Sequence, residues 1–460
     1  MIISSRTNNR HISQGGIFMK KIFALGLAVL MTASLALTGC GGGSSNNTTE
    51  AANGGNGGGQ TAEGGIRLVN NKVEIDAALK ELAAKYQEET GVAVTIESLG
   101  GGVDTQATLK GYYQAGNMPD IFVIEGDKDY PTWEGNLADL SGMEWTKDTE
   151  NGYEVDGVMY GFPTTTEAIG LAYNKSILDA CGVDPASITS PAAMKAAFDA
   201  VAAKKDELGL TAVIGYCAEA SQLYWSTGQH LFGTYLDEGL ARDDSTYMDL
   251  LADGGQLDDA RLADWAQMVA MFNEYSDPDL LVSGTYDQQV LNFTSGKYAF
   301  VTQGSWIGAT MTDADHKDAY AEAGNFEVGM APYAFQDGQD TILTNTPNWW
   351  AVYKDGNVDA AKAFLEWCAK NDGGQQILVE KCGFVSPYKS CTYVANDPFA
   401  KTIVDHTAAG KTSAWHWLSM KDGIGQNATG VVFQDFAAGN YTTEQFVETL
   451  KEVIAAYYAN

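Results

Sequence analysis

The tryptophans of this chain gather in short segments that we expect to lie outside helices. Six of the 10 Trp fall in such segments: Trp225, Trp306, Trp349, Trp350, Trp415 and Trp417. An indole face stacks on the C–H face of a sugar ring, and this chemistry fits Trp placed at strand ends and in loops. Core packing is the alternative for each of them. Successive residues of a strand face opposite ways, so at most one of Trp349 and Trp350 faces a ligand, and which one is left open.

Polar side chains near expected strand ends would complete such a site, because carboxylates and amides bond sugar hydroxyls. The candidates are Glu167, Asp127, Asn71, Glu74 and Gln229. Asp127 follows an apolar strand run, and Glu167 is an isolated acid in a threonine-rich segment. Glu74 also fits the role of a first-turn helix acid. The sequence thus offers stacking and hydrogen-bonding groups together.

The elements that must position these residues alternate between strand and helix. Apolar spacing predicts strands at 66–70, 92–96 and 121–124, with helices at 73–90 and 104–115 between them. This order predicts an open α/β sheet with parallel strands, whose ligands bind at the carboxyl ends. Later helices are expected at 191–208, 258–275, 359–369 and 443–458, and later strands at 168–173, 299–302 and 350–353. We therefore expect two α/β lobes, with the chain passing between them more than once.

The N-terminal region is typical of a secretory address. Lys20 and Lys21 precede an uncharged apolar run at 22–37, too short for a good transmembrane helix. Leu37-Thr38-Gly39-Cys40 resembles the lipobox of bacterial lipoproteins, which implies cleavage before Cys40 and a lipid on its sulfur; an ordinary signal with an incidental Cys is the alternative. We expect residues 1–18 to precede the natural start, 19–39 to be a signal peptide, and 40–65 to be the lipidated Cys with a flexible linker.

Four stretches of the remaining chain resemble the extracellular solute-binding proteins of family 1, the group that contains maltose-binding protein. They read GNMPDIFVIEG (116–126), YGFPTTTEAIGLAYNKSIL (160–178), FTSGKYAFVTQGSWIG (293–308) and AAKAFLEWCAKNDGGQQIL (360–378). They occur in the family's order, and Trp306 matches its stacking Trp.

The resemblance implies a two-lobe, type II periplasmic-binding-protein-like fold with a hinge and an interlobe cleft. Lobe 1 would comprise 66–172 plus 345–405, and lobe 2 would comprise 173–344 plus 406–460. It also implies a monomeric carbohydrate-binding protein that delivers its ligand to the permease subunits of an ABC importer, while the lipid on Cys40 holds it at the cell membrane. The several Trp favour an oligosaccharide over a monosaccharide, because each can stack on one ring. No catalytic residue, cofactor or metal is expected.

Charge and motifs exclude several other functions. From Cys40 onward the chain has 59 Asp+Glu against 24 Lys+Arg, a formal charge of −35, which disfavours nucleic-acid binding. The sequence has no His-Glu-x-x-His or Gly-x-Ser-x-Gly motif. Acid pairs for glycoside hydrolysis cannot be judged by counting, so a lipid-anchored polysaccharide-degrading enzyme is the main alternative, followed by a sugar-sensing receptor.

Five cysteines follow Cys40, so at least one is unpaired within the chain or pairs with another chain. They are Cys181, Cys217, Cys368, Cys382 and Cys391. Cys382 and Cys391 are close enough in sequence for a small disulfide loop.

Overall fold

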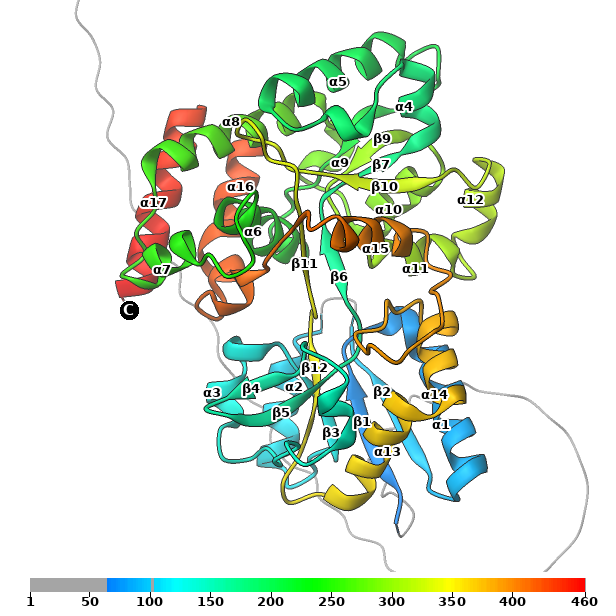
Figure 1. Cartoon of the computed structure of the whole chain (residues 1–460). Helices are drawn as coiled ribbons and strands as arrows, with labels where there is room; N and C mark the ends of the chain where they lie inside the picture. The colour runs from blue at the N-terminus through cyan, green and yellow to red at the C-terminus, as the bar shows by residue number, and fades with distance from the viewer. Residues whose placement is uncertain (1–63, 101–102, 460) are drawn as a thin grey trace, which may run out of the picture. The chain divides into compact units, whose positions relative to one another are not determined.

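The computed structural model describes residues 64–100 and 103–459, which form three sheets (Figure 1). The six-stranded sheet has the order β2 (Val94–Ser98), β1 (Ile66–Asn70), β3 (Ile121–Ile124), β12 (Trp349–Val352), β5 (Val158–Pro163), β4 (Tyr153–Val155). The four-stranded sheet has the order β10 (Val328–Ala331), β7 (Leu171–Asn174), β9 (Tyr298–Val301), β8 (Ala212–Gly215). The third has the order β13 (Thr412–Ser413), β11 (Ile342–Asn345), β6 (Glu167–Ile169).

The first α/β units form as the sequence predicts. β1 pairs in parallel with both β2 and β3, and all five of its residues are buried. Helix α1 (Asp76–Thr90) ends at Gly91, whose φ of 79° suits a residue without a side chain. Helix α2 (Thr105–Gln114) begins at Asp104, which accepts a 2.9 Å hydrogen bond from the Ala107 amide.

The expectation of parallel strands holds only for this half of the six-stranded sheet. β12 inserts between β3 and β5 and runs antiparallel to both, and β4 is antiparallel to β5. β12 comes from 225 residues later in the chain than β3, so local periodicity carries no information about this pairing.

The expected single strand at 168–173 is two strands in different sheets, and this expectation was wrong. β6 pairs with β11, whereas β7 pairs with β9 and β10. Gly170 separates β6 from β7, and a Cβ atom there would lie 2.9 Å from the Cβ of Met330. Glycine therefore permits the close approach at the point where the chain passes from β6 into β7 of the four-stranded sheet; β11 makes the return passage toward the six-stranded sheet (Figure 1).

Helices cover the sheets in two groups. The helices that pack around the six-stranded sheet are α1, α2, α3 (Tyr130–Trp133), α13 (Val358–Lys370) and α14 (Asp372–Gln376). The others are α4 (Lys175–Cys181), α5 (Pro191–Lys204), α6 (Phe232–Asp237), α7 (Thr246–Ala252), α8 (Asp259–Tyr275), α9 (Pro278–Leu281), α10 (Tyr286–Thr294), α11 (Ile307–Thr312), α12 (Lys317–Glu322), α15 (Ala400–Ala408), α16 (Gly430–Ala437) and α17 (Thr443–Ala459).

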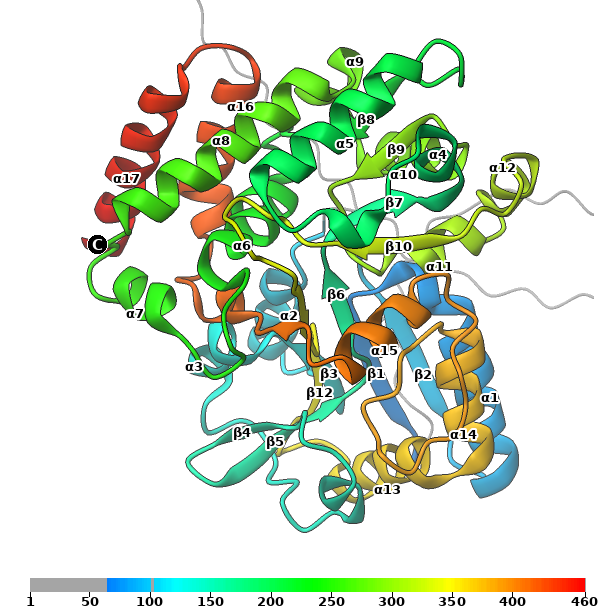
Figure 2. The same cartoon turned by 45° about the horizontal axis from the view of Figure 1, so that its top comes forward.

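The C-terminal helices pack on α8 through aromatic rings. Figure 1 and Figure 2 both show α8, α16 and α17 side by side. The ring centroids of Trp265 and Phe433 are 5.7 Å apart, and those of Phe433 and Phe446 are 5.4 Å apart. Edge-to-face and offset aromatic contacts of this kind stabilise a core beyond the area they bury.

All three expected lobe boundaries fall inside elements of the structure. Position 172/173 lies within β7, 344/345 lies within β11, and 405/406 lies within α15. Helix α15 packs on β10, where the Thr402 hydroxyl accepts a 3.3 Å hydrogen bond from the Met330 amide. Helix α15 therefore belongs with the four-stranded sheet, on which it packs. The exact division of the chain into lobes is a proposal.

All five cysteines of the described part are free thiols, so the small disulfide loop between Cys382 and Cys391 is not formed. The expected signal peptide, Cys40 and all but the last two linker residues lie outside the described residues. Within residues 64–100 and 103–459, no helix is long and apolar enough to cross a membrane.

Candidate functional site

A cavity of about 300 Å³ lies beside the end of β12. The six-stranded sheet and the turn after β3 contribute Gly126, Asp127, Tyr153 and Trp349. The other wall consists of Arg242, Asn345, Ala414, Trp415, His416, Leu418 and Ser419. This volume is at the lower end of the range for small-molecule sites, and the walls combine aromatic faces with a few polar groups, as such sites do.

Asp127 joins the two walls through its carboxylate. It lies in the 3₁₀ helix η2 (Gly126–Lys128), directly after β3. Oδ1 accepts a 2.8 Å hydrogen bond from the Tyr153 hydroxyl, and Oδ2 accepts a 3.1 Å hydrogen bond from the Ser419 hydroxyl. A carboxylate at this position accepts hydroxyl hydrogens, and a sugar hydroxyl offers the same donor.

Strand β12 decides which of its two tryptophans reaches the cavity. Trp349 lines it and donates a 2.6 Å hydrogen bond from Nε1 to the Asn151 carbonyl. Trp350 points to the other face, where it is 1% exposed and stacks on Phe162 at 5.9 Å. Trp350 is therefore a core residue, and its place among the candidates is corrected, because side chains alternate along a strand.

A second, smaller cavity of about 20 Å³ lies near β6. Its polar lining includes Lys72, Glu74, Glu167, Ser305 and Asp397, and Trp306 forms part of the wall. The Lys72 Nζ atom lies 2.6 Å from Glu167 Oε1 and 3.6 Å from Glu74 Oε1. Three of the sequence candidates, Glu74, Glu167 and Trp306, thus meet at one place.

Burial and charge act together on the Lys72 group. Burial alone lowers the pKa of Lys72, but Glu167 and Glu74 offset this, so the pKa lies above its ordinary value. Burial raises the pKa of Glu167 against the opposing effect of Lys72. Both directions are consistent, because one ammonium faces two carboxylates and one negative charge is in excess.

An aromatic cluster connects the walls of the two cavities. His230 lies at its centre, with ring centroids 4.9 Å from Trp306, 4.6 Å from Trp417 and 5.3 Å from Trp225. Trp417 is in turn 5.7 Å from Trp415, which lines the larger cavity. Burial, followed by the charges of Lys128 and Lys72, lowers the pKa of His230 to about 3, so its ring is neutral at physiological pH.

Two of the polar sequence candidates lie outside both cavities. The Asn71 side-chain oxygen Oδ1 accepts a 3.1 Å hydrogen bond from Nδ2 of Asn348. Gln229 lies in a π-helical turn (Ser226–Leu231), is 9% exposed and packs near Gly425. Trp225 and Trp417 take part in the aromatic cluster without lining either cavity.

Sequence reasoning missed Lys72, Tyr153, Arg242 and His416. Lys72 had a usable signal, because it lies two residues after the end of β1, and the carboxyl ends of strands mark ligand sites in such sheets. Arg242 and His416 had none, since they reach the cavity only through long-range packing of the segments that follow α6 and β13. Among the described residues, no group of His, Cys, Asp and Glu is arranged to hold a metal ion.

Comparisons with known proteins agree with this architecture. Residues 81–408 match the family described as bacterial extracellular solute-binding protein. The melibiose/raffinose/stachyose-binding protein MelE of Bacillus subtilis is 29% identical over 117 residues, a segment that spans 24% of this chain and only 27% of that protein.

Solved structures match over nearly their whole length. A chitin oligosaccharide binding protein has a TM-score of 0.69 at 20% identity, covering 87% of this chain and 100% of that one. A sugar transporter protein of Bacillus licheniformis, in complex with stachyose, has a TM-score of 0.65 at 17% identity, covering 85% and 99%. These likenesses show the two-lobe fold of periplasmic binding proteins. The chain belongs to the bacterial extracellular solute-binding proteins.

Proposed function

We propose that this protein captures an oligosaccharide for an ABC importer, while a lipid on Cys40 holds it at the outer face of the cell membrane. The single observation that carries the proposal is the cavity of about 300 Å³ between Trp349 and Trp415. Its aromatic walls suit sugar rings, and Asp127 and Arg242 suit hydroxyls. MelE and the stachyose-bound structure support this ligand class by what their names state.

The mechanism follows from walls that belong to different parts of the fold. Tyr153 and Trp349 belong to the six-stranded sheet, whereas Arg242 and Trp415 come from segments outside it. A ligand that contacts both favours the closed arrangement over the open one and shifts the population toward it. The closed, loaded monomer is then the form that docks on the permease.

Family membership sets aside the polysaccharide-degrading enzyme, because this family consists of solute-binding proteins rather than enzymes. The protein performs no chemistry in this account. Its task is differential binding between an open and a closed state.

Calorimetric titration of the purified chain from residue 41 onward tests the proposal. The panel contains raffinose, stachyose, chitin oligosaccharides and their monosaccharides, with release of reducing sugar assayed in parallel. We expect tight binding of at least one oligosaccharide without turnover. Hydrolysis, or no binding across the panel, would overturn the proposal.

The lipid anchor has its own test. The full chain, expressed in a bacterium, should fractionate with membranes, and Cys40→Ala should release it or leave it as uncleaved precursor. A membrane fraction unchanged by Cys40→Ala would contradict anchoring through this residue. Light scattering of the purified protein checks the monomeric state.

A further inference from the structure

The segment from Thr412 to Ser419 carries much of one wall of the larger cavity. It contains β13 and the 3₁₀ helix η7 (His416–Ser419). Trp415, His416 and Ser419 line the cavity, and Trp417 contacts His230 in the aromatic cluster. So short a strand and one helical turn do not hold their own conformation in water, so other elements must hold this segment in place.

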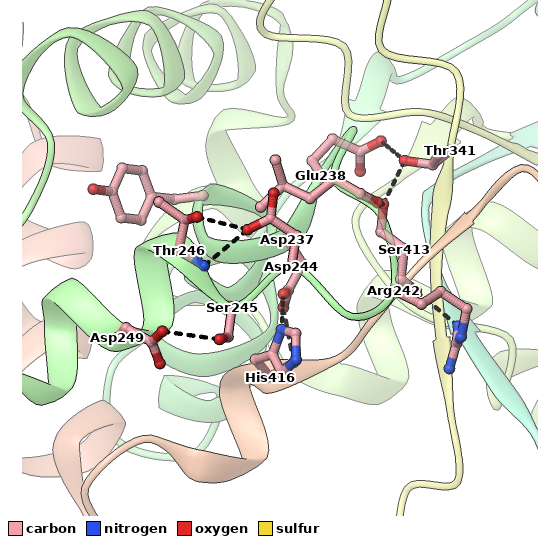
Figure 3. Close-up of polar contacts among 12 residues, drawn as sticks. Asp237, Glu238, Arg242, Asp244, Ser245, Thr246, Asp249, Thr341, Ser413 and His416 are labelled. Atoms are coloured by element: carbon pink, nitrogen blue, oxygen red, sulfur yellow. Dashed lines mark hydrogen bonds and ion pairs between the residues drawn. The ribbon is translucent and has the colours of Figure 1, made fainter. Parts of the chain in front are cut away.

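One buried carboxylate binds the middle of the segment. Asp237, the last residue of α6, is 1% exposed. Its Oδ2 accepts a 2.8 Å hydrogen bond from the His416 backbone amide, and its Oδ1 lies 2.5 Å from His416 Nδ1 (Figure 3). His416 lies between the two tryptophans in sequence, so this double contact fixes both the backbone and the ring at that point.

A second set of contacts holds the start of the segment. Arg242 Nη1 donates to the carbonyl oxygens of Ser413 at 3.0 Å and Thr344 at 2.9 Å. The Ser413 hydroxyl donates to the Leu240 carbonyl at 2.7 Å and contacts the Thr341 hydroxyl at 2.8 Å (Figure 3). These contacts anchor β13. Between β13 and Ser419, which bonds Asp127, the Asp237–His416 contact is the polar tie next to both tryptophans, whose rings also pack on each other and on His230.

We propose that Asp237 is a positioning residue of the ligand site, which through His416 sets the places of Trp415 and Trp417. The proposal rests on the proposed function for its ligand. Asp237 itself does not line the cavity. It acts through His416, which lines the cavity. A charge-assisted double hydrogen bond to a buried carboxylate is strong enough to fix the position of His416.

The charged groups that act on His416 come from three places. They are Asp237 on α6, Arg242 and Asp244 in the loop after it, and Asp249 on α7. The 3₁₀ helix η2, which carries Asp127 and Lys128, also packs against η7. The Asp237 carboxylate raises the pKa of His416 above its ordinary value, against the lowering effects of burial and Arg242. The charges around His416 therefore favour the protonated form of its imidazole ring.

The pH dependence has a definite sign. A raised histidine pKa in the folded protein means that the ion pair contributes fully below the ordinary pKa and is lost as pH rises through the raised value. If the pair positions the tryptophans, ligand affinity falls over that same rise in pH. A purely structural carboxylate elsewhere in the fold would not couple affinity to this titration.

The test uses Asp237→Asn, which keeps the size and a hydrogen-bond acceptor but removes the charge. Asp277→Asn is the matched control, because Asp277 is also buried, accepts a 2.8 Å hydrogen bond from Tyr298 and lines neither cavity. Oligosaccharide affinity, melting temperature and the NMR titration of His416 are measured for both variants.

We expect Asp237→Asn to weaken binding at least about tenfold and to lower the pKa of His416 toward its ordinary value. Asp277→Asn should cost stability and leave both readouts at their wild-type values. His416→Gln, a neutral donor, should bind with an affinity that does not change between about pH 6 and about pH 9, whereas the wild type weakens.

Wild-type affinity in Asp237→Asn, or an unchanged His416 titration, would overturn the proposal. If Asp237→Asn fails to fold, the pH profile of His416→Gln decides, and a profile like that of the wild type overturns it. If no oligosaccharide binds the wild type, the proposed function fails. The His416 titration and the tryptophan emission of Asp237→Asn still test the positioning by themselves, and wild-type behaviour in both overturns it.

Discussion

The two cavities contrast in how their polar groups are satisfied. In the smaller one, of about 20 Å³, Lys72 is paired with Glu167 at 2.6 Å, and both side chains are almost fully buried. In the larger one, of about 300 Å³, Asp127 accepts only from neutral hydroxyls, those of Tyr153 and Ser419. At the first place the Lys72 ammonium is paired within the protein and one negative charge is left in excess, while at the second the Asp127 carboxylate is bound by hydroxyls rather than by a cation.

This difference predicts that substitutions at the smaller cavity mainly change stability and that substitutions at the larger cavity mainly change ligand affinity. A buried ion pair that loses one partner leaves an uncompensated charge, so the smaller cavity is where a substitution should harm folding most. A carboxylate bound only by hydroxyls exchanges one hydroxyl for another at low cost, so the larger cavity is where a substitution should change affinity. Trp306 and the aromatic cluster link the two places.

The largest expected effect is on stability, from Lys72→Met. Removing the ammonium leaves buried Glu167 without its partner, so we expect the free energy of unfolding to fall by about 3–5 kcal/mol at neutral pH, measured with urea. Part of this loss should return as the pH is lowered, because protonation removes the unpaired charge. Lys80→Met removes an exposed partner of Asp76 and should change stability by less than about 1 kcal/mol. Equal effects of the two variants would contradict the comparison.

The largest expected effect on affinity comes from Trp306→Ala. Trp306 lines the smaller cavity, but it is half-buried and its ring contacts the aromatic cluster that continues to Trp415 at the larger cavity, so we expect binding to weaken about tenfold or more. Its melting temperature should stay near that of the wild type. Trp350→Phe is the control, since it should lower stability through the Phe162 contact and leave affinity unchanged. Collapse of stability in Trp306→Ala with affinity retained would make Trp306 a core residue.

Trp349→Ala should weaken binding by a smaller factor, about fivefold. Trp349 is only 7% exposed, and its ring packs on Tyr153 at 5.3 Å, so it offers a ligand less surface than Trp306 does. Trp349→Phe keeps an aromatic face and loses the hydrogen bond to Asn151, so its affinity should lie between those of the wild type and Trp349→Ala. Titration calorimetry measures the affinities of the series. A Trp349→Ala variant that binds like the wild type would show that this wall of the cavity does not contact the ligand.

Asp127→Asn gives the smallest expected change, a loss of about two- to fivefold in affinity. The amide keeps an acceptor oxygen and removes the charge that strengthens it. Tyr153→Phe deletes one donor to Asp127 and leaves the carboxylate in place, so it should weaken binding less. A change in stability greater than that in Lys72→Met would reverse the contrast between the cavities.

Part of the candidate site was predictable because it depends on local rules. Asp127 and Lys72 follow parallel strands at their carboxyl ends, where ligands bind in such sheets. Trp306 follows Gly304-Ser305 in a stretch with a recognisable family pattern. The same rules also put Asn71 forward, and the structure instead places it against Asn348, because a strand end contains several side chains and only some point into the cavity.

The early fold was predictable for a similar reason. Apolar periodicity placed β1, β3 and α1, and glycine and aspartate marked the helix ends. The same periodicity merged β6 and β7 into one strand, because hydrophobicity reports burial and not which sheet a residue joins. Gly170 was the only local sign of the break, and its meaning depends on Met330, 160 residues later.

By itself, the sequence determined the class of the fold and the family, and it supplied the aromatic and acidic residues of the proposed ligand site, since each rests on residue types and their order. Only the tertiary structure decided that Trp349 rather than Trp350 meets the larger cavity, and that Lys72 neutralises Glu167. It also decided that Asp237 holds His416, 179 residues further on. The physical reason is common to all three: each is a contact between segments far apart in the chain, and such pairings depend on three-dimensional packing that local sequence patterns do not encode.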